Sequence, residues 1–209
     1  VADLTIGAVT GATYNLTLTT GGGAGAEIAG TSVSGVGTLT IGNSGGATFS
    51  STVGATTVTL TNTTGTIAFN GALTATTLNT AAQAYNVALN ASTGTITNAV
   101  TFSNTGTVTL GTSGGTLAFT GGVVATAPSA VTVNGTVTAA GTGVITLGDS
   151  DTGVAIASNA TIGGTSTGAI TLGAATLVDG ATLTVGTGIA NTISLSSVTG
   201  TAANATSHL

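Results

Sequence analysis

The sequence predicts an all-β protein that folds as a β-solenoid, a stack of turns made of short parallel strands. Three observations lead to this prediction. Apolar residues alternate with threonine in short segments along the whole 209-residue chain. The composition suits strands joined by tight corners, with 35 glycines, one proline and abundant threonine. The chain also contains an internal repeat, which is typical of solenoids.

The internal repeat is clearest between two segments that start fifty residues apart. Thr57–Thr76 (TVTLTNTTGTIAFNGALTAT) and Thr107–Thr126 (TVTLGTSGGTLAFTGGVVAT) are identical at 11 of 20 positions. Each segment reads as two short strands separated by a corner of Gly, Ser, Thr or Asn. In the second segment Val108 and Leu110 alternate with threonines, so their side chains share one face of the strand.

The apolar residues are small, which favours a thin core. Hydrophobic residues make up 41% of the chain, but it has only four Phe, two Tyr and no Trp or Met. Such an inventory fits a narrow core of branched side chains better than the wide core of a compact globule. Composition hardly changes along the chain, so we expect one solenoid domain over residues 1–209.

A triplet of apolar, polar and apolar residues is the predicted core strand of each turn. Most neighbouring triplets start 19–25 residues apart, but the steps from 58 to 87 and from 108 to 145 are longer and suggest a degenerate turn or a loop. About nine turns at the strand spacing of about 4.8 Å would form a rod about 40 Å long. The triplets begin at Leu16, Leu39, Val58, Val87, Val108, Ile145, Ile170 and Ile193. The predicted core contains Leu39, Ile41, Val58, Leu60, Val108, Leu110, Ile145, Leu147, Ile170 and Leu172.

Other strands and corners complete the predicted turns. The chain opens with an alternating segment at Asp3–Ile6, and Ala81–Asn90 is interpreted as a loop that enters a strand although its residues also favour a helix. A β-sandwich remains an alternative, since it also uses short strands with frequent turns. Second strands are expected at 48–49, 67–69, 117–119, 154–156 and 183–185. Corner residues, chosen because Asn, Asp and Gly tolerate positive φ, are Asn43, Asn62, Thr112 and Asp149, most of them behind a glycine.

The charge balance excludes several classes of partner. The chain has no Lys or Arg and a formal net charge of −5. A nucleic-acid-binding protein needs cations for the phosphates, and an anionic membrane surface would repel this chain. No apolar run approaches the roughly 18 residues of a membrane-spanning helix. We therefore expect neither nucleic-acid binding nor membrane insertion.

Few residues could carry chemistry. The single histidine, His208, lies next to the C-terminal residue, where a catalytic base would lack a fixed geometry. Asp149 and Asp151 alternate in a glycine-rich corner and are the one candidate Ca²⁺ site, although a turn role for Asp149 is the better interpretation. We expect no catalytic residue, no enzymatic activity and no other cofactor.

The outward threonines form a second candidate surface. If the triplets stack, their central residues lie in one column, a threonine ladder at Thr40, Thr59, Thr109, Thr146 and Thr171. Such an array could bind ice, but stacked β-branched side chains also stabilise a sheet by packing across strands.

Two segments resemble repeats of a known kind of protein. Gly37–Phe49 (GTLTIGNSGGATF) and Gly106–Phe119 (GTVTLGTSGGTLAF) are similar to the repeats of filamentous haemagglutinins and autotransporter adhesins. These are large secreted proteins of bacterial surfaces. The resemblance implies a right-handed parallel β-helix that is exported and acts as a stalk, an adhesin or a matrix fibre.

The expected function is therefore structural. Ala2–Ala8 and Asn191–Val198 are strand-like, without lysine or proline to block a sheet edge. We expect an extracellular protein that assembles head to tail with itself into a filament at the cell surface or in a biofilm matrix. Alternatives are a stalk fragment of a large adhesin, with a cell-surface or glycan ligand, and an ice-binding protein.

Overall fold

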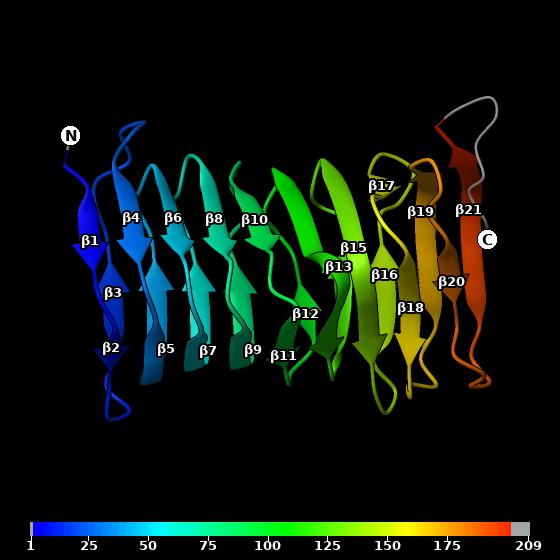
Figure 1. Ribbon diagram of the computed structural model, residues 1–209, viewed down its shortest axis with the longest axis horizontal. Coiled ribbons are helices and arrows are strands. Elements are labelled where there is room, and N and C mark those ends of the chain that lie inside the picture. Colours follow the sequence, from blue (N-terminus) through cyan, green and yellow to red (C-terminus); the bar gives the residue numbers. More distant parts are fainter. Residues whose placement is uncertain (1, 202–209) are drawn as a thin grey trace.

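Parallel pairing between successive turns builds the whole structure. The computed structural model describes residues 2–201, and every strand pair in this range is parallel, as between Val87 and Val108 or between Leu110 and Val133. These residues contain no helix, and they wind into a β-solenoid of about nine turns, which confirms the predicted fold (Figure 1). The strands are β1 (Leu4–Ile6), β2 (Val9–Thr10), β3 (Leu16–Leu18), β4 (Glu27–Gly30), β5 (Val33–Ile41), β6 (Gly46–Phe49), β7 (Val53–Leu60), β8 (Thr66–Phe69), β9 (Leu73–Thr80), β10 (Asn86–Leu89), β11 (Thr93–Ile96), β12 (Val100–Thr101), β13 (Thr107–Phe119), β14 (Gly122–Ala125), β15 (Ala130–Ala139), β16 (Val144–Leu147), β17 (Gly153–Ile156), β18 (Ala160–Gly164), β19 (Ile170–Leu177), β20 (Leu183–Val185) and β21 (Ile193–Gly200).

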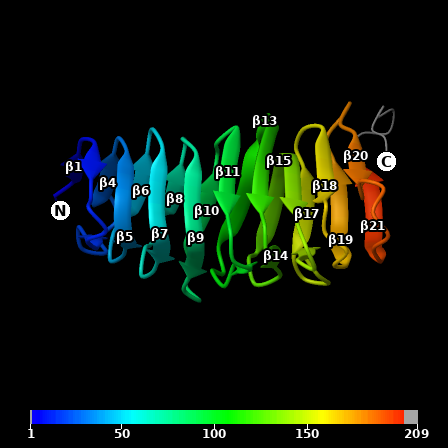
Figure 2. The ribbon, with the colours of Figure 1, turned by 90° about the horizontal axis from the view of Figure 1, so that it is seen from below.

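Each turn has three faces, which we name A, B and C in chain order. Face A holds the whole of β1, β4, β6, β8, β10 and β17. It also holds the first halves of β13 and β15 and the last parts of β19 and β21. Face B begins with β2 and the first halves of β5, β7 and β9, and ends with β11, the second halves of β13 and β15, β18 and β20. Face C holds β3, the second halves of β5, β7 and β9, then β12, β14, β16 and the first parts of β19 and β21. Figures 1 and 2 show the turns side by side along the long axis.

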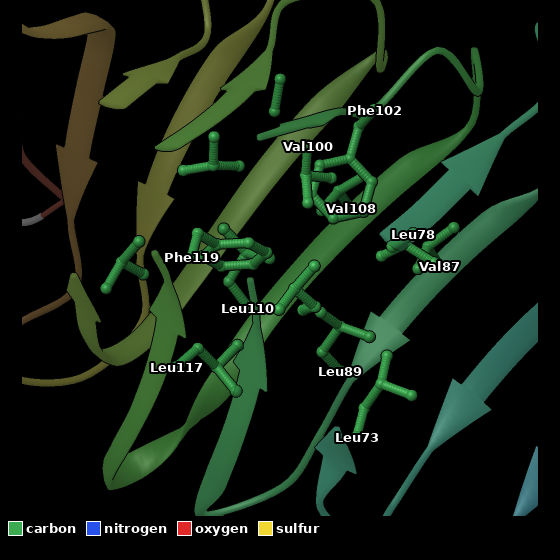
Figure 3. Packing of buried hydrophobic residues seen from close by; sticks show 14 of the residues in the cluster. Leu73, Leu78, Val87, Leu89, Val100, Phe102, Val108, Leu110, Leu117 and Phe119 are labelled. Atoms are coloured by element: carbon green, nitrogen blue, oxygen red, sulfur yellow. The ribbon is translucent and has the colours of Figure 1, made fainter. Parts of the chain in front are cut away.

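Inward side chains of the three faces meet in a narrow apolar core. Leu89 of β10 and Leu110 and Phe119 of β13 converge inside the solenoid (Figure 3). Because strands alternate, the outward positions between these residues carry threonine, alanine or asparagine. All ten predicted core residues are buried, which confirms that part of the prediction: Leu39, Ile41, Val58, Leu60, Val108, Leu110, Ile145, Leu147, Ile170 and Leu172.

The few aromatic residues fill gaps in this core. Phe49 and Phe69 stack in adjacent turns with ring centres 5.5 Å apart and planes 8° apart. Phe49 covers Gly30 of the preceding turn, where a Cβ would lie 2.6 Å from the ring. Tyr85 is fully buried at a corner, where its hydroxyl donates to the Leu60 carbonyl oxygen (3.0 Å). The helical alternative for 81–90 does not occur, because the segment is a turn followed by β10.

The corners use the residue types that the sequence suggested. Asn43 has a φ of 47°, and Gly111 and Gly148 also adopt positive φ, whereas Asn62, Thr112 and Asp149 do not. Inside the C-to-A corners, buried hydroxyls replace apolar side chains, as in the hydrogen bond between Ser44 and Thr63 (3.1 Å). The glycines and amides thus turn the backbone, while hydroxyl groups satisfy polar atoms that the corner buries.

The predicted stacking of the triplets is wrong for two of them. Val87 and Val108 belong to face A, whereas the other triplets lie on face C. The long steps in the spacing do hide degenerate turns, as expected, because they pass over the face C segments Leu78-Asn79-Thr80 and Val123-Val124-Ala125. Face C continues there through Leu78, Val100 and Val123, whose strands do not all repeat the apolar–polar–apolar pattern.

The internal repeat is out of phase with the turns. Thr57–Leu60 lies on face C, but its counterpart Thr107–Leu110 lies on face A. The fifty-residue offset therefore corresponds to two turns and one further face. Each copy spans three strands, about a full turn, and each strand of the second copy lies one face further on than its counterpart in the first.

Candidate functional site

The candidate Ca²⁺ residues form a turn. Asp149 Oδ1 accepts hydrogen bonds from the backbone N–H groups of Asp151 and Thr152, both at 2.9 Å. The Thr152 hydroxyl in turn donates to the Pro128 carbonyl oxygen (2.6 Å). Among residues 2–201 no three acidic, histidine or cysteine side chains gather as metal ligands would. The hydrogen bonds assign Asp149 a local role in shaping the corner.

The predicted threonine ladder is only partly assembled. Thr109 lies on face A between Ala88 and Thr132, so its placement in the ladder is wrong. The reason is the same shift in phase that places Val108 on face A. The ladder position of face C is occupied in order by Thr17, Thr40, Thr59, Asn79, Thr101, Val124, Thr146, Thr171 and Ser194. Asn79 and Val124 interrupt the row of hydroxyl groups.

Face B carries an unbroken row that the sequence analysis missed. Five threonines lie in register on successive turns: Thr93, Thr116, Thr136, Thr161 and Thr184. The neighbouring outward column holds Thr95, Ala118, Thr138 and Gly163, so the row has no complete second row beside it. The T-x-T pattern at 93–95 and 136–138 was the available signal, but corners of unequal length hid the register.

The two ends of the solenoid expose part of its core. In the middle turns nearly all inward side chains are buried, whereas most of those in the first and last turns are only partly covered. Ile193 is 44% exposed. Beside it lies an open recess of about 370 Å³, lined by Leu183, Val185 and Leu195 among others. The partly covered residues at the ends are Leu4, Ile6, Val9, Leu16, Val185, Leu195 and Val198.

Backbone hydrogen bonds give the two ends opposite character. Throughout the solenoid, core-facing residues direct their N–H and C=O groups to the following turn. Phe49 O thus accepts from Asn70 N–H, and Val53 N–H donates to Ala72 O (2.9 Å each). Outward-facing residues direct theirs to the preceding turn, because neighbouring residues of a strand point to opposite sides.

The same alternation determines which backbone N–H and C=O groups point away from the solenoid at each end. In the first turn Ile6 O accepts from Thr31 N–H (3.2 Å), so the N–H and C=O of Thr5 point away from the solenoid. In the last turn Thr201 N–H donates to Leu177 O (3.0 Å), so those of Val198 point away. One end therefore offers the groups of outward-facing residues and the other those of core-facing residues, which is the combination that pairs between any two successive turns.

Comparison with known proteins identifies no relative of this chain. No protein-family model, no curated protein and no solved structure matches it. Residues 2–201 include no helix long and apolar enough to cross a membrane. His208 lies outside the described residues.

Proposed function

We propose that this protein is an extracellular structural protein whose solenoids assemble end to end into a filament, at a bacterial cell surface or in a biofilm matrix. The observation that carries the proposal is the match between the two ends. On face A, the N–H and C=O groups of Val198 that point away from the solenoid have the orientation that β1 of a second copy needs for a parallel ladder. The partly covered apolar side chains at both ends would be buried at such a joint.

The surface of the shaft supports a structural role over a catalytic one. Apart from five acidic residues, its polar groups are hydroxyls and amides that bond to each other along the stack, as in the pair Asn90–Asn70 (3.1 Å). The resemblance of Gly37–Phe49 and Gly106–Phe119 to secreted adhesin repeats supports export to a bacterial surface. We expect no turnover of polysaccharides, esters or peptides by the purified protein.

Negative-stain electron microscopy over a range of concentrations tests the proposal. The wild-type chain should form filaments that lengthen with concentration. Thr5→Pro should prevent them, because proline removes an N–H group that points away from the solenoid and leaves the β1–β4 hydrogen bonds intact. Thr5→Val keeps the N–H group and should assemble like the wild type.

Discrete particles would contradict the proposal. Particles about 40 Å long at every concentration, the length of about nine strand spacings, would favour instead a segment of a larger adhesin stalk. Filaments of equal length from Thr5→Pro would show that the strand edges do not form the joint.

A further inference from the structure

We infer that two copies of this chain also associate side by side, in antiparallel orientation, through the corner between faces B and C. In this arrangement Val144 of each copy occupies a hollow in face B of the other. The contact uses the sides of the shaft and not its ends. It therefore goes beyond the proposed end-to-end assembly and does not depend on it.

The distribution of acidic residues leaves this corner uncharged. All five lie at the two borders of face A, four at the C-to-A corner and one at the A-to-B corner, and the chain has no Lys or Arg. The corner between faces B and C is the one opposite face A. Two copies that meet there keep their like charges away from the contact, where salt screens the remaining repulsion. The five residues are Asp3, Glu27, Asp149, Asp151 and Asp179.

The first half of this corner is hollowed. Strands β5, β7 and β9 pass through it without a break, and on the face B side they border an open hollow of about 330 Å³. Its floor is low because Gly54 has no side chain and the inward positions beside it hold Ala55 and Ala75. In the next two turns the same inward column carries Ile96 and Phe119, whose larger side chains hold the backbone further out, and the hollow closes.

The second half of the corner projects. There the continuous strands give way to loops of residues 140–143 and 165–169. Val144 follows the first loop and is 41% exposed on face C, where its neighbours in the same outward column are Gly122 and Ala169. Among the large hydrophobic residues of 2–201 it is the only strongly exposed one outside the first and last turns. A branched apolar side chain that stands between two smaller residues gains free energy when a partner covers it.

One symmetry operation brings the two halves together. β7 borders the middle of the hollow, and Val144 begins β16 four turns further on, about 19 Å away at the usual strand spacing (Figure 1). A two-fold axis through the corner midway between them reverses the shaft and exchanges the face B side with the face C side. Val144 of each copy then lies over the hollow of the other, and each projecting half meets a hollowed half. Closed two-fold pairs of this kind are the commonest homo-oligomers.

The size of the contact determines when it is stable. A strip about three residues wide and about nine turns long measures about 10 Å by about 40 Å, or about 400 Å² per copy. Stable complexes bury about 800 Å² per partner, so single copies should pair only weakly. Shafts joined end to end would repeat the contact once per copy and hold together firmly, a step that does rest on the proposed assembly.

Disulfide cross-linking tests the contact in single copies. The chain has no cysteine, so Val144→Cys and Thr56→Cys each introduce one thiol, at the projecting residue and at the hollow. Both are made in the Thr5→Pro background, which should keep copies from joining end to end. On mild oxidation an equimolar mixture should cross-link at least about fivefold faster than either variant alone, because a disulfide needs closely placed side chains. Thr132→Cys, in the middle of face A, replaces Val144→Cys in the control mixture.

The rates separate the arrangements. Equal rates for the mixtures with Val144→Cys and with Thr132→Cys would overturn the inference and leave the proposed assembly intact. Faster cross-linking of Val144→Cys with itself than with Thr56→Cys would overturn the antiparallel arrangement.

Filaments provide a second measurement. Wild-type filaments should lie in pairs in negative-stain micrographs, and Val144→Asp should give single filaments of unchanged length, because its charge would be buried only in the lateral contact. Thr132→Asp places the same charge on face A and should leave the pairs unchanged. Single wild-type filaments would contradict the lateral contact. Absence of wild-type filaments would contradict only the end-to-end assembly, and the cross-linking rates would then decide the lateral contact alone.

Discussion

Gly30→Ala should destabilise the solenoid, although replacing glycine within a strand usually has the opposite effect. A Cβ at position 30 would lie 2.6 Å from Phe49 Cδ1 and 2.7 Å from Cε1. Ordinary carbon contacts begin near about 3.5 Å, so the ring would have to move by about 0.9 Å. The ring is fully buried and stacked on Phe69 at 5.5 Å, which leaves it no free direction. Overpacking of this kind costs about 1–3 kcal/mol.

Urea unfolding followed by far-UV circular dichroism measures this effect. The matched control is Gly54→Ala, because the nearest atom to a Cβ there is Val33 O at 3.9 Å. That variant should be neutral or up to about 1 kcal/mol more stable, through a less flexible unfolded chain. Adding Phe49→Leu to Gly30→Ala should recover at least about 1 kcal/mol, since Leu89 and Leu110 occupy the same column. Equal stability of Gly30→Ala and Gly54→Ala would contradict the close packing of the Phe49 ring against Gly30.

Three further predictions concern Tyr85, Asp149 and the face B threonines. Burial raises the pKa of Tyr85 to about 12. The free energy of unfolding should therefore be constant below pH 10 and fall by about 1.4 kcal/mol per pH unit between pH 10 and 12. Chemical unfolding at pH 9 and 11 should show this decline in the wild type and not in Tyr85→Phe. Asp149→Ala should lose about 1–3 kcal/mol with its two hydrogen bonds and Asp149→Asn less, while a melting temperature raised by Ca²⁺ would contradict the turn role. The single threonine row of face B should give no thermal hysteresis, and hysteresis that Thr136→Lys abolishes would establish ice binding instead.

The sequence predicted the fold because its two main signals are local. Alternation identifies a strand and its inward face from three residues, as in Val58-Thr59-Leu60, and glycine or asparagine identifies the corner that follows. Neither signal depends on which strands are neighbours in space. The solenoid class and its core could therefore be predicted without the register.

Register was harder to predict, because strands of the three faces have nearly the same sequence. Thr107–Leu110 and Thr57–Leu60 are identical, yet they lie on different faces. The face on which a strand lies depends on the lengths of the corners before it, and these vary from turn to turn. An error of one strand in the assignment therefore moves a residue such as Thr109 to another face. The end surfaces were predicted only in outline, since the strand-like character of the first and last segments does not say which backbone groups point outward.

Moving one copy of the repeat into the place of the other tests whether strands are interchangeable between faces while corners are not. Replacing Thr107–Thr126 with a second copy of Thr57–Thr76 keeps every inward position apolar. It also places two threonines and an alanine where Gly111, Gly114 and Gly122 adopt φ values of 79°, 74° and 102°. Each such residue should cost about 1–2 kcal/mol, and at position 122 a Cβ would also meet Val144 O at 2.5 Å. The transplant should therefore lose about 3–6 kcal/mol in urea unfolding. A version that retains the three glycines should unfold near the wild-type midpoint, and equal instability of both versions would show that the strands themselves carry the information that fixes the face.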